Sequence, residues 1–255
     1  MQASEVVSIE KLSEREHKVL CYPTTEKTEV EKRLKELKKL GVQALEFTGE
    51  KRIADVPVLG KGCVGIVVIA HTNSGRTALK IRRTDADRKE MSHEGEMLKT
   101  ANTTNVGPKL LDISQNLLLM QLIEGTHFPE WLKTIEENRD QSRLKLVLKN
   151  VLEQCHRLDK AGLDHGELSK APKHILVDAS DHPFLVDFET ASTSRRVSNV
   201  TSVCQYLFLG SQIAPKVKEK LRKIDEKDLV KALQTYKRKR TRENFEKILE
   251  KTELI

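Results

Sequence analysis

The sequence contains no long hydrophobic run, which limits the classes of protein it can belong to. Its longest largely apolar stretches, residues 64–70 and 117–123, are far shorter than the roughly 20 residues that span a bilayer. We therefore expect no membrane-spanning helix. The first residues carry charges where a secretory signal peptide has its apolar region, so secretion is not expected either.

Cysteine is scarce, and no two cysteines are close in the sequence. The chain has 4 cysteines and no CxxC pair, the four being Cys21, Cys63, Cys155 and Cys204. This spacing argues against both a disulfide framework and a zinc site. Thiols stay free in reducing compartments, so the sequence predicts a cytoplasmic protein.

The residues that are abundant are typical of a globular protein. Of 255 residues, 38% are hydrophobic and 33% are charged, and the apolar residues recur periodically, which excludes a disordered or fibrous chain. The length suits one large domain or two lobes. With 45 basic and 38 acidic side chains the formal net charge is +7, which favours an acidic or nucleic-acid-associated partner.

The first half of the chain changes from helical to strand-rich. Apolar spacing in residues 26–40 predicts a lone amphipathic helix, with Gly41 as its C-terminal cap. Residues 50–123 then have the pattern of a small sheet with one helix. A glycine loop lies between two expected strands, a hairpin leads to a third, and residues 116–123 form a strand buried on both faces.

Caps and apolar stripes predict the helix within residues 50–123 and the helices of the second half of the chain. The first is expected to run to about Ala101, with Asp85 or Asp87 as its N-cap. A long helix ending near Gly162 carries a stripe of Leu144, Leu148, Val151, Cys155 and Leu158. The remaining elements are expected to be strands at 174–177 and 184–188 and helices at 200–209 and from 216 to the end.

Four residues near position 60 spell GxGxxGxV. They are Gly60, Gly62, Gly65 and Val67. A dinucleotide-binding fingerprint leads from a strand into a helix, whereas this one leads into the β-branched run IVVIA. A strand, glycine loop and second strand can cover nucleotide phosphates with backbone NH groups. The alternative is a glycine-rich hairpin that binds no ligand.

A lysine on the next strand needs a charged partner. Strand alternation places Lys80 on the face opposite to its apolar neighbours. On the following helix, Glu94 falls inside the apolar stripe that contains Met91 and Leu98, where a carboxylate is costly unless it is paired. We expect a Lys80–Glu94 pair; the alternatives are a solvated Glu94 at the edge of the stripe, or Glu90 as the partner.

These segments together resemble the protein kinases. LGKGCVGIV is similar to the glycine-rich loop, TALKI to the strand with the phosphate-anchoring lysine, and HEGEML to the helix with its glutamate. Later and in the same order, LLLMQLIEG resembles the hinge, HGELSKAPKHILV the catalytic loop and LVDFE the metal-binding segment. Six ordered motifs over about residues 52–210 make an accidental match very unusual.

The resemblance implies a role for each matching residue. Lys80 would hold the α and β phosphates of ATP, Glu94 would orient Lys80, Asp187 would hold Mg²⁺, and Glu167 would position or deprotonate the acceptor hydroxyl. His165 is expected to brace the catalytic loop. The implied nucleotide-binding residues are Gly60, Gly62, Cys63, Gly65, Val67, Ala78, Lys80, Met120, Gln121, Ile123 and Leu176.

The catalytic loop departs from the kinase pattern. It is two residues longer, so His174 stands where the family has a metal-binding asparagine, with Lys173 beside it. His174 is either a metal ligand together with Asp187 or a structural loop histidine, and Lys173 could reach a phosphate. Glu167 replaces the usual aspartate, and its extra methylene shifts the carboxylate by roughly 1.5 Å.

The segment after LVDF also departs from it. Glu189 replaces a glycine, as in choline-kinase-like and aminoglycoside-kinase-like enzymes. No APE motif follows, and only about ten residues separate Asp187 from the next expected helix, so the peptide-docking activation segment is missing. With the HGELS phrase, this makes the chain most similar to the minimal, atypical RIO-like kinases, specifically a small archaeal-type group of predicted serine/threonine kinases.

The resemblance implies a bilobal, kinase-like α+β fold. We expect an N-terminal helical extension over residues 1–49, a sheet lobe over 50–124 and a helical lobe over 125–255. The implied function is ATP- and Mg²⁺-dependent phosphorylation of a protein serine or threonine, with autophosphorylation. The alternatives are a small-molecule kinase, and a pseudokinase or ATP-gated binding module.

A basic run lies near the C-terminus. Residues 236–242, YKRKRTR, contain five basic side chains among seven. They could contact RNA phosphates, in keeping with the ribonucleoprotein partners that a RIO-like resemblance implies. The alternative is the solvated face of a helix, on which acidic residues such as Glu243, Glu246 and Glu250 pair with them.

Overall fold

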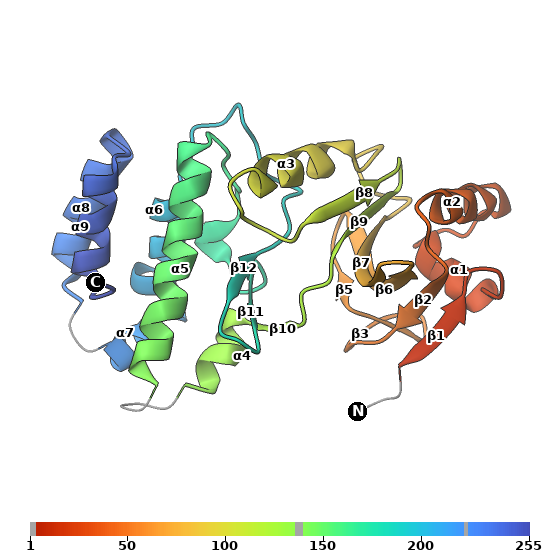
Figure 1. Ribbon diagram of the computed structural model, residues 1–255, viewed down its shortest axis with the longest axis horizontal. Helices are drawn as coiled ribbons and strands as arrows, with labels where there is room; N and C mark the ends of the chain where they lie inside the picture. Colours follow the sequence, from red (N-terminus) through yellow and green to blue (C-terminus); the bar gives the residue numbers. More distant parts are fainter. Residues whose placement is uncertain (1–3, 136–139, 222–223) are drawn as a thin grey trace. The chain divides into compact units, whose positions relative to one another are not determined.

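The computed structural model describes residues 4–135, 140–221 and 224–255. The chain divides into two compact units, one made of Met1–Lys99 and Lys109–Leu122, the other of Thr100–Pro108 and Ile123–Ile255 (Figure 1). The first is rich in strands and the second in helices. The α+β class predicted from the sequence is therefore confirmed.

The first unit is built on an antiparallel sheet. Its strands follow the order β1-β2-β6-β7-β9-β8, and β5 pairs with β6 to make seven. These strands are β1 (Glu5–Ser8), β2 (Ala44–Phe47), β5 (Gly60–Lys61), β6 (Gly65–Thr72), β7 (Gly75–Arg82), β8 (Leu110–Ile113) and β9 (Leu117–Gln121). A separate hairpin joins β3 (Lys51–Ile53) to β4 (Val56–Val58).

Helices lie on both faces of this sheet. Helices α1 (Glu14–Leu20) and α2 (Lys27–Lys39) share a buried apolar core with one face, to which Leu79 of β7 belongs. Helix α3 (Ser92–Asn102) lies on the opposite face, where a β-carbon at Gly95 would stand 2.3 Å from Ile113 Cδ1. Glycine at this position lets α3 approach β8 closely enough for its glutamate to reach β7.

The N-terminal region differs from the expected helical extension. The expected amphipathic helix is present as α2, and Gly41 follows it with a left-handed φ of 70°. However, the same region also supplies α1 and the strands β1 and β2, and β2 pairs with β6. Strands as short as these four-residue segments carry too little periodicity to be recognised without their partners.

The start of α3 is also later than expected. The helix begins at Ser92, so neither Asp85 nor Asp87 caps it. The Asp85 carboxylate instead accepts hydrogen bonds from the guanidinium of Arg83, the shorter at 2.7 Å. A side chain that can cap a helix can equally pair with a nearby arginine, and the sequence does not distinguish the two.

The second unit consists of helices around α5 and a small sheet. Strands β10 (Gly125–His127), β11 (Ile175–Asp178) and β12 (Pro183–Leu185) form an antiparallel sheet, and β12 contacts α5 (Gln141–Lys160). On α5 the expected stripe is fully buried, and Gly162 follows the helix at a φ of 73°. The other helices are α4 (Phe128–Lys133), η1 (Leu168–Lys170), α6 (Asn199–Cys204), η2 (Gln205–Leu209), α7 (Ala214–Leu221), α8 (Glu226–Arg238) and α9 (Arg242–Lys251).

The structure also describes the cysteines and the helices that the sequence analysis considered. All four cysteines are free thiols, and Cys63 alone among them is exposed. Within the described ranges, no helix combines the length and the apolar composition needed to cross a membrane.

Candidate active site

The glycine loop lies directly over Lys80. Gly60 and Gly65 belong to β5 and β6, and the Gly62 NH closes the loop by donating to the Gly65 carbonyl at 2.8 Å. Val67 is paired with Lys80 across the β6–β7 ladder. A β-carbon at position 65 would stand 3.0 Å from both Cγ and Cε of Lys80, so only glycine leaves room for the lysine side chain.

The other two glycines of the motif are not required by the packing of the chain itself. A β-carbon at Gly60 would approach Val67 side-chain atoms to 3.4 Å, and one at Gly62 would meet the Gly65 carbonyl at 3.5 Å, which is an ordinary contact. Neither has the positive φ that favours glycine. Open backbone without side chains is what a loop needs if a ligand is to approach its NH groups.

The predicted pair of Lys80 and Glu94 is present. Lys80 Nζ lies 2.8 Å from Glu94 Oε2 and 2.9 Å from Oε1, and each residue is 5% exposed. Glu94, rather than Glu90, is therefore the partner of Lys80. Because both side chains are buried, removing one of them would leave the other as an unpaired buried charge, which is strongly destabilising.

The remaining nucleotide-binding candidates of the first unit lie on or between strands of the same sheet. Ala78, buried on the same face of β7 as Lys80, is paired with Met120 of β9. Cys63 is exposed between β5 and β6. The Gln121 NH donates to the Lys109 carbonyl at 2.8 Å, so this NH is already used within the sheet.

Two other candidates belong to the second unit. Ile123 is the first residue of its larger segment, and Leu176 is half-buried in β11, where it pairs with His127 and Phe184. Their roles toward a nucleotide remain predictions.

In the second unit, three candidate polar residues converge. Glu167 Oε2 lies 3.1 Å from His174 Nε2, and one ligand atom from each of Glu167, His174 and Asp187 falls within 4.8 Å of the others. Asp187 has a left-handed φ of 71°, a conformation that non-glycine residues rarely adopt. Such strain is found at functional sites, where the surrounding structure holds it in place.

His165 braces this loop, as expected. It is fully buried; its backbone NH donates to Asn199 Oδ1 at 2.8 Å, and its Nε2 lies 3.1 Å from the Val186 carbonyl. Burial lowers the pKa of His165 to about 4, so the ring is neutral at physiological pH. With a carbonyl as its neighbour, Nε2 carries the proton and donates it there.

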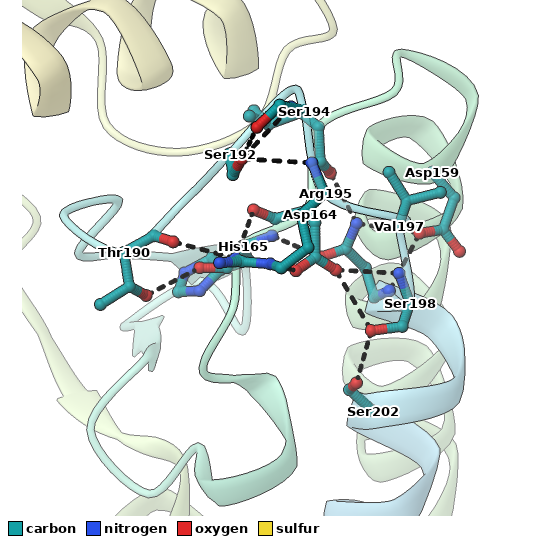
Figure 2. A network of polar contacts seen from close by, with 12 residues as sticks. Asp159, Asp164, His165, Thr190, Ser192, Ser194, Arg195, Val197, Ser198 and Ser202 are labelled. Atoms are coloured by element: carbon teal, nitrogen blue, oxygen red, sulfur yellow. Dashed lines mark hydrogen bonds and ion pairs between the residues drawn. The ribbon is translucent and has the colours of Figure 1, made fainter.

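A second network holds the chain that follows Asp187 against the catalytic loop. Figure 2 shows the Asp164 carboxylate between Arg195, whose Nε donates at 2.7 Å, and Ser198, whose NH donates at 2.9 Å. Arg195 Nη2 also donates to the Thr190 carbonyl at 2.9 Å. Gly166 has a left-handed φ of 93°, and a β-carbon there would stand 3.0 Å from the Thr190 carbonyl, so the backbone itself favours glycine at this position of HGELS.

These supporting residues were not identified from the sequence. Asp164 is 3% exposed and belongs to the loop, whereas Arg195 and Asn199 lie some thirty residues later. One signal was available: Asp159 follows Cys155 by four residues and so lies on the apolar stripe of α5. Its Oδ1 accepts from the Asn199 NH and side-chain amide, each at 2.9 Å.

The chain has recognisable relatives among known proteins. Residues 70–198, about half of the chain, match the RIO domain. The chain belongs to the RIO domain family. RIO domains are atypical protein kinases, and the match includes Lys80, Glu94, Glu167 and Asp187 but begins after the glycine loop. The chain is also similar to an uncharacterized protein of Methanocaldococcus jannaschii, 28% identical over 102 residues that cover 40% of this chain and 83% of that protein.

The donors of this RIO domain fit a divalent cation. Kinases of this kind use ATP and a metal ion. Glu167 and Asp187 supply carboxylate oxygens and His174 supplies a ring nitrogen, all close enough to share one ion. The cluster lies within the second unit alone, so its geometry does not depend on the placement of the first.

The basic run, residues 236–242, follows the matched RIO domain and is partly engaged within the second unit. Arg242 pairs with Glu246 and with Glu153, both at 2.8 Å, and Arg240 Nη2 donates to the Val197 carbonyl at 2.7 Å. The expected pairing with Glu246 is therefore present. Contact with RNA through this run stays a prediction.

Proposed function

We propose that this RIO domain is an ATP-dependent serine/threonine protein kinase that requires a divalent cation and phosphorylates itself. The observation that carries the proposal is the buried Lys80–Glu94 pair beneath Gly65. A buried ion pair contributes little to the stability of a sheet compared with apolar residues, which favours a role in binding for these two charges. A lysine fixed by a glutamate below a glycine loop is suited to anchor the phosphates of a nucleotide.

The second unit supplies the other groups that phosphoryl transfer needs. In the proposal Asp187 is the anionic ligand of the metal, which would neutralise phosphate charge. Glu167 is the carboxylate available to position or deprotonate the acceptor hydroxyl. His165 is buried, neutral and bonded to the Val186 carbonyl, so it holds the loop rather than exchanging protons.

The segment after Asp187 supports constitutive activity. The segment of residues 188–198 is short. It is already held without a phosphate, because Arg195 and the Ser198 NH both donate to the Asp164 carboxylate. In kinases with long activation loops, phosphorylation supplies such an ordering contact. We therefore propose that the isolated chain is active without prior phosphorylation and phosphorylates generic peptides weakly.

The test is incubation of dephosphorylated protein with γ-labelled ATP and a divalent cation. Label is expected on serine or threonine of the protein itself, with sites assigned by mass spectrometry. Asp187→Asn should abolish labelling while leaving the melting temperature near that of the wild type, because the substitution removes a charge with little change in shape. Asp228→Asn, a partly exposed aspartate on α8 outside the candidate site, is the control and should label normally.

Other outcomes would redirect the assignment. Stoichiometric label on an aminoglycoside or choline-like alcohol, with no phosphoprotein, would place the chain with small-molecule kinases, in keeping with Glu189. Release of free phosphate alone would indicate an ATPase. Nucleotide binding without any turnover would indicate a pseudokinase, and no thermal shift with millimolar nucleotide and metal would contradict all of these assignments.

A further inference from the structure

We propose that Glu167, His174 and Asp187 bind one divalent first-row transition metal, such as Mn²⁺, more tightly than Mg²⁺. The cluster offers two carboxylate oxygens and one imidazole nitrogen. The inference rests on the proposed function only in taking Asp187 as a metal ligand. It goes further in making His174 and Glu167 ligands of the same ion and in setting which metal the site selects.

The spacing of the donors suits a single ion. Two ligands about 2.1 Å from a metal, at right angles to each other, lie about 3 Å apart. Glu167 Oε2 and His174 Nε2 are separated by 3.1 Å, and the Asp187 donor lies within 4.8 Å of both.

The backbone of His174 is held by main-chain hydrogen bonds to two neighbouring segments. The His174 NH donates to the Ala171 carbonyl at 3.2 Å, and its own carbonyl accepts from the Val186 NH at 3.0 Å. Val186 directly precedes Asp187, so one hydrogen bond ties the two ligand residues together. The ring also packs edge-on against His165, with 5.6 Å between ring centroids.

The chemistry of the donors decides which metal is favoured. Mg²⁺ prefers oxygen ligands and gives up its waters reluctantly, so a nitrogen ligand adds little to its binding. Transition metals accept imidazole readily, and their affinity for such mixed sites rises from Mn²⁺ toward Cu²⁺. The two carboxylates together carry two negative charges, which balance a divalent ion. A histidine in place of an oxygen donor therefore moves the preference away from Mg²⁺.

The experiment uses the full chain, Mn²⁺ and no nucleotide. Titration of Mn²⁺ followed by the EPR signal of the free ion should give one site per chain. Pulsed EPR of the bound ion should show coupling to an imidazole ¹⁴N. In His174→Asn this coupling should disappear and the preference for Mn²⁺ over Mg²⁺ should fall by about tenfold or more, because an amide oxygen replaces the nitrogen. His182→Asn, which removes an exposed histidine outside the cluster, should change neither.

The wild-type spectrum decides the question even if a variant folds poorly. Bound Mn²⁺ without ¹⁴N coupling, or coupling that persists in His174→Asn, would overturn the proposal, as would equal affinity of the wild type for Mn²⁺ and Mg²⁺. Because no ATP is present, these results are separate from phosphoryl transfer. A nitrogen-ligated Mn²⁺ in a protein that transfers no phosphate would sustain this inference and contradict the proposed function; efficient transfer with Mg²⁺ and no ¹⁴N coupling would do the reverse.

Discussion

Gly65 and Lys80 are packed so closely that a methyl group on Gly65 would crowd the lysine side chain. A β-carbon at Gly65 would stand 3.0 Å from two carbons of the lysine side chain and 3.1 Å from the Ile81 carbonyl. The Ile81 carbonyl oxygen cannot move away without disturbing the hydrogen bonds between β6 and β7. The glycine loop and the lysine are therefore one structural unit.

This contact predicts different outcomes for two glycine substitutions. Gly65→Ala should lower the free energy of unfolding by about 1–3 kcal/mol, because it overpacks the lysine. It should also remove stabilisation by nucleotide. Gly62→Ala should leave the stability of the free protein nearly unchanged but weaken nucleotide binding. Thermal unfolding with and without ATP and metal measures both, and equal stability of the two variants would contradict the packing described for Gly65.

The buried ion pair predicts strong coupling between its two members. Lys80→Met removes the counter-charge from a buried carboxylate and should destabilise the protein by about 3 kcal/mol or more. Combining it with Glu94→Gln should recover part of that loss, since neither variant side chain is charged. Urea unfolding of the wild type, both single variants and the double variant gives the coupling energy. Strictly additive losses would show that the pair does not interact in solution.

Arg195 is predicted to act by holding the segment after Asp187. Arg195→Lys keeps the charge but cannot reach the Asp164 carboxylate and the Thr190 carbonyl together. We expect faster amide hydrogen exchange over residues 188–198 and reduced autophosphorylation, with a stability loss of about 1 kcal/mol. Arg196→Lys is the matched control, since its partner is a carbonyl of α8, that of Lys237. Unchanged exchange in Arg195→Lys would rule out the holding role.

The stability of the second unit is predicted to depend on pH through His156. Burial lowers the pKa of His156, whose Nδ1 lies 2.8 Å from the Tyr236 hydroxyl. The unfolded chain therefore binds a proton more readily, and stability contributed by the neutral ring is lost as pH falls below about 6.5. Burial raises the pKa of Asp159, so the contribution of this carboxyl to the pH dependence of stability has the opposite sign.

The comparison of wild type with His156→Gln isolates this contribution. Asp159 is present in both proteins, so its effect largely cancels in the difference. The loss of unfolding free energy between about pH 8 and pH 5 should be smaller in His156→Gln than in the wild type, as measured by urea unfolding. Parallel pH profiles would mean that His156 titrates alike in the folded and unfolded chain.

Features that depend on local spacing could be predicted from the amino-acid order alone. Alternation in β7 placed Lys80 on the face opposite to Leu79, and helical spacing placed Glu94 in the apolar stripe of α3, so their pairing followed from the cost of burying either charge alone. The same periodicity predicted α2, α5 and the strands around the glycine loop. Ordered motifs, rather than any single one, indicated the RIO family.

Features that depend on partners distant in the chain could not be predicted and are seen only in the folded protein. Strand β2, which pairs with β6, and the edge strand β1, which pairs with β2, were not predicted, because neither short segment shows a clear alternation of apolar and polar residues without its partners. Asp164 and Arg195 are ordinary polar residues until the chain folds back and buries the carboxylate beside the guanidinium. The approach of His174 to Glu167 and Asp187 is likewise fixed by the hydrogen bond between His174 and Val186, which joins segments that the sequence separates.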